Sequence, residues 1–213
     1  MGRTMLIAVA GLAASATVAN AQAILTFAFS DVDGSFSVSD GLFSGRSNAT
    51  TSGDVTRLAA PGGTALFNPG FAGGVADFSF DIDVMLTTPS TADGTGSFSI
   101  VDAQGEALTG DIEGEFTTLG SFIVFRGLLS GVQFNDVSGD GTFDGPSGGS
   151  FGTDLPGNPP FTGAFVELFI TDSGFFVSDF SGVSTQVIGE IIPAPASLAL
   201  LGLGGLAATR RRR

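Results

Sequence analysis

The sequence predicts an all-β fold, an antiparallel β-sandwich or jelly-roll-like domain, with an N-terminal signal helix and a C-terminal hydrophobic helix beside it. Apolar and polar residues alternate in short segments, most clearly over 78–84, as they do in strands with one buried face. Clusters of Gly, Asp and Ser separate these segments, and no stretch of the body has the apolar period of an amphipathic helix. Many short strands joined by such turns are typical of sandwiches and jelly rolls.

Residues 1–21 have the features of a secretory signal peptide. Arg3 lies near the start, a short apolar stretch follows, and Ala19-Asn20-Ala21 forms an A-x-A cleavage motif. Cleavage after Ala21 is the first choice, and cleavage after Ala23 is the alternative. The prediction is export of the body through a Sec-type machinery.

The body, residues 22–187, is a Phe/Gly-rich acidic segment whose strand signals recur along its length. The predicted strands cover 24–30, 34–38, 78–84, 96–101, 108–116, 120–127, 131–134, 165–171 and 175–183. The stretch 145–163 lacks this pattern, so we expect a surface loop there. The stretch 44–74 is loosely patterned and is expected to wrap one edge of the sheets. The 21 phenylalanines are the only aromatic residues, and we expect them to supply much of the core.

The charge of the chain and the residue types that it lacks exclude several classes of function. All 21 acidic residues lie between Asp31 and Glu190, where only three arginines accompany them. Such a surface repels nucleic acid, so no nucleic-acid partner is expected. Because the chain has no His, Cys or Lys, it lacks an imidazole base, a thiol nucleophile and a Schiff-base amine. We therefore predict a protein that is not an enzyme.

Carboxylate chemistry is the alternative that these absences leave open. A glycoside hydrolase could use one acid from Asp111, Glu113 or Glu115 with Glu167 opposite. Nothing in the spacing selects such a pair. The first three also alternate along one predicted strand, where a solvated outer face explains them.

The segment 135–144 is the strongest local candidate for a metal site. Asp136, Ser138, Asp140 and Asp144 occupy positions 1, 3, 5 and 9 of a calcium-loop pattern, with Gly141 at position 6. The twelfth position is Ser147 in place of the usual glutamate. We expect either no cofactor, with an ordinary Asp/Gly turn at this place, or Ca²⁺ bound by the four oxygen-bearing side chains.

The C-terminal segment, 188–213, has three parts. A proline motif covers Pro193, Ala194, Pro195, Ala196 and Ser197, a hydrophobic helix is predicted over 196–209, and Arg210, Arg211, Arg212 and Arg213 end the chain. The helix is short for a bilayer core. The arginines would keep this end on the cytoplasmic side and so place the body outside the inner membrane.

This order of motif, helix and arginines resembles the PEP-CTERM protein-sorting signal. The family's usual motif is Pro-Glu-Pro, and Ala194 takes the central position here. The resemblance covers about a tenth of the chain. It implies that an exosortase-like membrane enzyme processes the exported protein near the proline motif, and it implies no activity for the body.

Together these features predict an exported protein of the cell envelope, cell surface or extracellular matrix, with transient or retained anchoring in the inner membrane. The body is expected to have a structural or interaction role. The alternative is a polysaccharide-binding, calcium-stabilised β-sandwich module, and a carboxylate hydrolase is the least favoured.

Overall fold

The computed structural model describes residues 23–157, 159–161, 164–170 and 174–192. The described part contains twelve strands: β1 (Leu25–Ser37), β2 (Leu42–Arg46), β3 (Ser52–Arg57), β4 (Gly63–Phe67), β5 (Asp77–Thr88), β6 (Thr91–Val101), β7 (Ala107–Leu119), β8 (Phe122–Asn135), β9 (Thr142–Asp144), β10 (Ser150–Gly152), β11 (Ala164–Ile170) and β12 (Phe180–Ile191). The prediction of an all-β, antiparallel domain is confirmed. None of the described residues forms a helix long and apolar enough to span a membrane.

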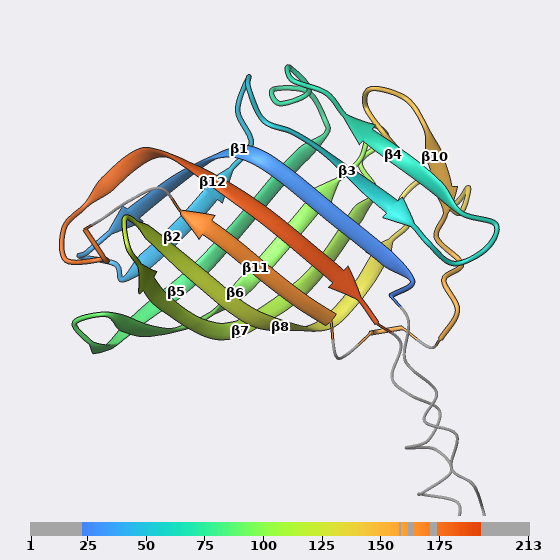
Figure 1. The fold of residues 1–213 in the computed structure, drawn as a ribbon. Coiled ribbons are helices and arrows are strands. Elements are labelled where there is room, and N and C mark those ends of the chain that lie inside the picture. Colours follow the sequence, from blue (N-terminus) through green and yellow to red (C-terminus); the bar gives the residue numbers. More distant parts are fainter. Residues whose placement is uncertain (1–22, 158, 162–163, 171–173, 193–213) are drawn as a thin grey trace, which may run out of the picture. The chain divides into compact units, whose positions relative to one another are not determined.

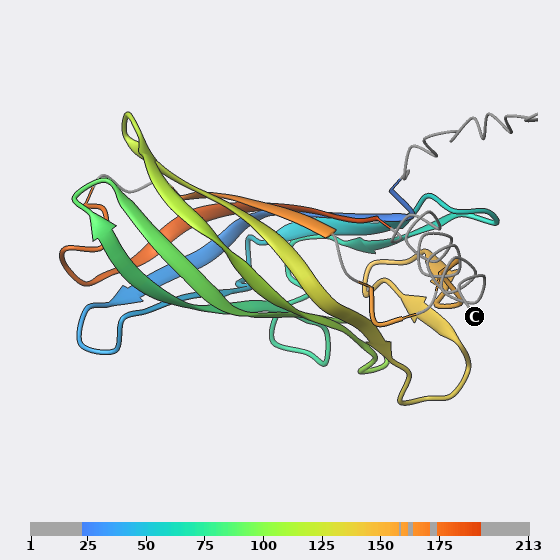
Figure 2. The same cartoon turned by 90° about the horizontal axis from the view of Figure 1, so that it is seen from below.

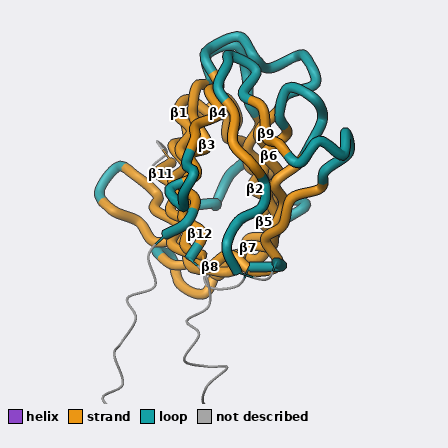
Figure 3. Tube along the Cα trace, turned by 90° about the vertical axis from the view of Figure 1, so that its right-hand side faces the viewer, coloured by secondary structure: helices purple, strands orange, loops and turns teal. Residues whose placement is uncertain are grey.

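The main sheet closes on itself, so the predicted two-sheet sandwich or jelly roll is wrong. Eight strands follow one another in the order β12, β11, β8, β7, β6, β5, β2 and β1, and β1 pairs antiparallel with β12. That pairing runs from Leu25 opposite Ile191 to Phe36 opposite Phe180 and completes an antiparallel barrel (Figures 1 and 3). Alternating apolar and polar residues show that one face of a strand is buried. The pattern is the same whether that face packs on a second sheet or on the opposite wall of a barrel, so it cannot distinguish the two folds.

One long strand links the barrel to a side arm. The first half of β1 pairs with β3 and its second half with β2, and β4 continues the arm beyond β3. β3 and β4 lie within the stretch 44–74, which we expected to wrap one edge of the sheets but for which we predicted no strands. The outer edge of β4 bonds to the turn of the β9–β10 ribbon (residues 142–152), through Leu66 N to Gly148 O at 3.0 Å. The ribbon lies at one end of the barrel (Figure 2).

Several predicted strands are longer or shifted. β1 and β8 each merge two predicted strands, and β10 lies inside the stretch 145–163, where only a loop is predicted. The last predicted strand, 175–183, starts too early, because Phe175 and Phe176 adopt left-handed backbone angles and β12 begins at Phe180. β12 continues to Ile191, so its last four residues pair within the barrel although we assigned them to the C-terminal segment.

Phenylalanine rings fill the interior, which confirms the predicted core. The fully buried rings are Phe27, Phe43, Phe67, Phe78, Phe80, Phe116, Phe125, Phe143 and Phe176. Some of these rings lie directly over glycines of a neighbouring strand. A Cβ atom added at Gly45 would lie 2.1 Å from the ring of Phe80, and one at Gly189 would lie 2.1 Å from that of Phe27. Both glycines are therefore required by packing rather than by backbone angle.

Candidate metal centre

Two chain segments meet at the end of the β6–β7–β8 sheet. The β6–β7 turn, residues 102–106, connects two strands whose last pair is Val101 opposite Ala107. Ala107 also pairs with Asn135, the last residue of β8. The strand register therefore places Glu106, just before β7, next to the loop 136–141 that follows β8.

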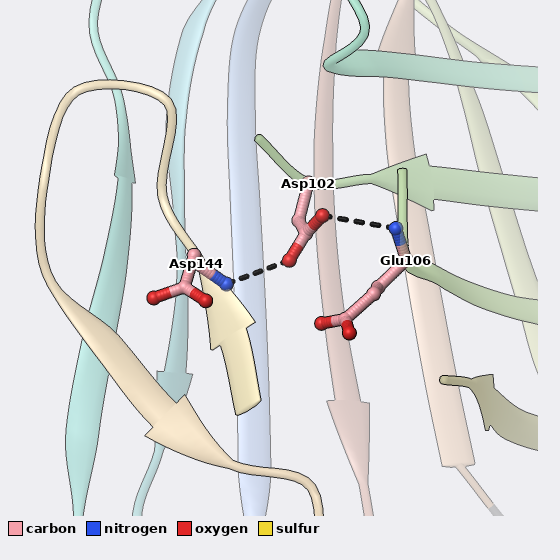
Figure 4. Close-up of side chains that lie close together, drawn as sticks. All are labelled: Asp102, Glu106 and Asp144. Carbon is pink, nitrogen blue, oxygen red and sulfur yellow. Dashed lines mark hydrogen bonds between the residues drawn. The ribbon is translucent and has the colours of Figure 1, made fainter. Parts of the chain in front are cut away.

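Asp102 organises this junction through its backbone contacts. Its side chain is fully buried, and Oδ1 accepts hydrogen bonds from the backbone N–H groups of Gln104, at 2.7 Å, and Glu106, at 3.0 Å. Oδ2 accepts a third hydrogen bond from the N–H of Asp144 at 2.7 Å (Figure 4). A buried carboxylate with three N–H donors is well satisfied, so Asp102 fixes the turn to β9.

Glu106 is buried but only half satisfied. Its side chain is 1% exposed, and Oε1 accepts a hydrogen bond from the Ser138 hydroxyl at 2.5 Å. Oε2 is also buried and has no hydrogen-bond partner among the described residues. Burial raises the pKa of Glu106; the hydrogen bond from Ser138 opposes this rise, and the charge of Asp102 adds to it. A buried carboxylate in this state favours neutralisation, by a proton or by a cation.

The loop 136–141 curls around its own carboxylates. Asp136 accepts hydrogen bonds from the backbone N–H groups of Gly139, at 2.6 Å, and Gly141, at 3.1 Å. Both glycines have positive φ angles, 77° and 73°, which side-chain-bearing residues rarely adopt. Asp140 accepts the N–H of Thr142 at 2.8 Å, and that hydrogen bond lowers the pKa of Asp140.

Asp144 faces the same junction from β9. Its Oδ2 accepts a hydrogen bond from the Gln104 side-chain amide at 2.8 Å. The Thr142 hydroxyl lies 2.8 Å from this oxygen and from Oδ1 of Asp140, and it can donate its single proton to one of them at a time. The hydrogen bonds to the clustered carboxylates thus come from backbone N–H groups, hydroxyls and one amide, all of them neutral.

The carboxylates form two overlapping groups that share Glu106. One group contains Asp102, Glu106 and Asp144, and the other contains Glu106, Asp136 and Asp140; within each, one oxygen per residue lies within 4.8 Å of the others. Figure 4 shows the first group converging from the turn and from β9. Two oxygens on opposite sides of a calcium ion are about 5 Å apart, so either group is compact enough for one such ion.

Of the four residues predicted for the calcium loop, Asp136 and Asp140 share one group with Glu106, and Ser138 donates to Glu106. Asp144 lies in the other group, with Asp102 and Glu106. Sequence reasoning missed Asp102 and Glu106, because their segment has the composition of a plain turn between strands. The signal that could have found them is the pairing of the two flanking strands, which brings the end of one turn to the start of the other.

Other predicted residues lie elsewhere or cannot be placed. Asp111, Glu113 and Glu115 are exposed on the outer face of β7. The side chain of Glu167 is not described. The cleavage residues Ala19 and Ala21, the motif 193–197 and the arginines 210–213 lie outside the described residues.

A second polar attachment holds the far side of the ribbon. Arg57, at the end of β3, is 4% exposed, and its guanidinium donates to the carbonyls of Ala59, Ala60 and Gly152. It also pairs with the exposed carboxylate of Asp154 just after the ribbon. The Arg57 attachment contains a positive and a negative side chain. The cluster around Glu106 contains carboxylates and, among the described residues, no cation.

No protein family, no curated protein and no solved structure matches this chain.

Proposed function

We propose that the chain is an exported structural or interaction protein of the cell envelope or extracellular matrix, sorted through its PEP-CTERM-like C-terminal segment. The observation that carries this proposal is the division between the inside and the outside of the barrel. Phenylalanine rings pack against one another in the interior, and the outer face of β6 and β7 presents polar groups in cross-strand rows. Because packed rings fill the interior, a partner would bind the outer surface of the barrel.

The outer face is strongly acidic. Ser97 pairs with Asp111, and the neighbouring pair Thr95 and Glu113 continues the same surface, with all four residues exposed. Arg46 neutralises Asp81 on this side, and the two side chains remain about half exposed. Such a face is suited to polar, hydrated contacts and is repelled by anionic polymers.

Removal of the sorting segment tests the delivery part of the proposal. A chain ending at residue 192 keeps β12 complete, because that strand ends at Ile191. We expect this truncated protein to fold and to be exported without being retained at the cell surface. Equal surface display of the truncated and full-length proteins would contradict the proposal.

Matched substitutions separate processing from anchoring. Ala194→Glu restores the family's usual Pro-Glu-Pro motif and should increase the fraction of chains cut near residues 190–197, measured by intact mass spectrometry of protein recovered from its host. Replacing the four terminal arginines by glutamine leaves the hydrophobic sequence 196–209 unchanged and should abolish that cut. An intact C-terminus in the parent and in the Ala194→Glu variant would contradict processing.

A polysaccharide-binding role is the second candidate, and one surface feature favours it. A shallow groove on the outer face is lined by hydroxyl, carboxylate and amide groups, which are the side chains that hydrogen-bond sugar hydroxyls; it includes Ser97, Ser99, Thr109, Asp111 and Gln133. Affinity electrophoresis in gels containing acidic and neutral polysaccharides tests this role. Retardation that Gln133→Ala removes would support it, and unchanged mobility in every gel would contradict it.

A further inference from the structure

We propose that Glu106, Asp136 and Asp140 bind one calcium ion, which fastens the loop after β8 to the β6–β7 turn. Such an ion would hold two segments of the domain together, a role separate from the proposed delivery and surface role.

The first observation is the buried, unpartnered oxygen of Glu106. Oε2 has no hydrogen-bond partner among the described residues, although the side chain is 1% exposed. An unsatisfied buried carboxylate oxygen is costly, and native proteins usually provide it with a donor, a water or an ion. The same carboxylate lies within reach of Asp136 and Asp140, so a cation placed among the three would satisfy it.

The second observation is the arrangement of the loop. Asp136, Ser138 and Asp140 supply positions 1, 3 and 5 of a calcium-loop pattern, but Ser147 replaces the glutamate expected at position 12. Glu106 reaches the loop from the facing turn and contacts Ser138. It therefore supplies, from a distant part of the chain, the carboxylate that the loop itself lacks.

The donor atoms decide the kind of ion. The site offers carboxylate and hydroxyl oxygens, and oxygen-only sites suit hard cations such as Ca²⁺ and Mg²⁺. The ligands come from two separate chain segments, the glycine-containing loop 136–141 and the β6–β7 turn. Calcium accepts such irregular geometry, whereas magnesium requires a near-ideal octahedron and retains its waters.

A proton is the competing explanation for Glu106. If Glu106 is protonated, it can donate to a neighbouring carboxylate, and no metal is then needed. Both explanations neutralise the carboxylate of Glu106, but only a calcium site predicts that added calcium raises the melting temperature. The experiment therefore measures the response of the melting temperature to calcium and to the loss of this one charge.

The full-length protein is melted by calorimetry in chelator, in CaCl₂ and in MgCl₂, and its binding of Ca²⁺ is measured by titration calorimetry. With calcium at ten times the dissociation constant, we expect the Tm to rise by about 3–6 °C. Extracellular calcium modules bind with dissociation constants of about 10⁻⁴–10⁻³ M, so millimolar CaCl₂ is required. An equal rise in MgCl₂ would overturn the assignment of calcium, and no heat with no rise would overturn the site.

Glu106→Gln is the decisive variant, and Glu113→Gln, an exposed glutamate on β7, is its matched control. Glu106→Gln removes the buried charge, so its Tm in chelator should equal or exceed that of the parent, while the calcium-dependent rise is lost. Glu113→Gln should keep the rise. A Glu106→Gln protein that retains the full rise would overturn the proposal. If that variant does not fold, Asp140→Asn, at an exposed position of the loop, must lose the rise for the proposal to stand.

Discussion

The barrel and the β9–β10 ribbon are held by different kinds of interaction. In the barrel, Phe43 lies within 6 Å, centroid to centroid, of the rings of Phe80, Phe116 and Phe176. The ribbon also packs two buried rings, Phe143 and Phe151. In addition, the guanidinium of Arg57 donates to Gly152, and the buried carboxylate of Asp102 accepts from the N–H of Asp144. The barrel is therefore expected to depend on ring packing alone, and the ribbon on ring packing together with these charged contacts.

Phe43→Ala tests the barrel and should have the largest effect. Removal of a fully buried ring leaves a cavity among its neighbours, and we expect a loss of about 3–5 kcal/mol in the free energy of unfolding. Urea denaturation measures this loss. Phe122→Ala, at a ring that is 46% exposed, is the control and should change stability by less than about 1 kcal/mol. Equal losses for the two variants would contradict a core built on packed rings.

Arg57→Met tests the charged attachment of the ribbon. The substitution keeps the aliphatic stem and removes the donors to the carbonyls of Ala59 and Gly152, so we expect a loss of about 2–4 kcal/mol. Limited proteolysis should then cut within 142–155 before the barrel is cut. Arg46→Met removes an exposed ion pair with Asp81 and should cost about 0.5 kcal/mol. Cleavage of the barrel strands first would contradict the separation of the two regions.

Ser138→Ala tests the carboxylate cluster around Glu106. Without this hydroxyl, neither oxygen of Glu106 has a donor among the described residues, so we expect a loss of about 1–2 kcal/mol when chelator is present. Denaturation curves in chelator measure the change. Ser39→Ala, at an exposed serine, is the control and should be nearly neutral. A neutral Ser138→Ala would show that the hydroxyl does not stabilise the buried carboxylate.

Acid should weaken the Arg57 attachment by protonating Asp154, with the smallest effect of the four. The hydrogen bond and charge of Arg57 lower the pKa of Asp154 below its ordinary value of 3.8. A carboxylate whose pKa is lowered by folding stabilises the fold above its unfolded pKa, and this contribution is lost as the pH falls through the lowered value. The Tm of Asp154→Asn should therefore lie slightly below that of the parent at neutral pH and match it in strong acid. A difference that persists in acid would contradict this account.

Much of the fold could be predicted because alternation is local. The strand around Phe78 to Val84 and the phenylalanine core were predicted correctly, since each depends on which residue types alternate. β2, β3 and β4 were missed because each is only five or six residues long and contains a glycine, which weakens the pattern. The start of β12 was predicted too early because two adjacent phenylalanines resemble a strand, whereas here they turn inward.

The candidate site also has one part that the sequence predicts and one part that it does not. The loop with Asp136, Ser138 and Asp140 could be recognised because its oxygen-bearing residues follow one another at fixed spacing. Glu106 is 30 residues earlier than Asp136 in the chain, and no spacing rule connects them. Only the pairing of Ala107 with Asn135 brings the two segments together.

The sequence by itself determined that the chain is all-β, that phenylalanine fills its core and that one loop is rich in oxygen ligands, because these properties depend on neighbours along the chain. Only the tertiary structure decided that the sheet closes into a barrel and that a buried glutamate faces the loop. Both depend on which strands pair across long separations, and strand pairing is set by the fit of whole surfaces rather than by any local pattern.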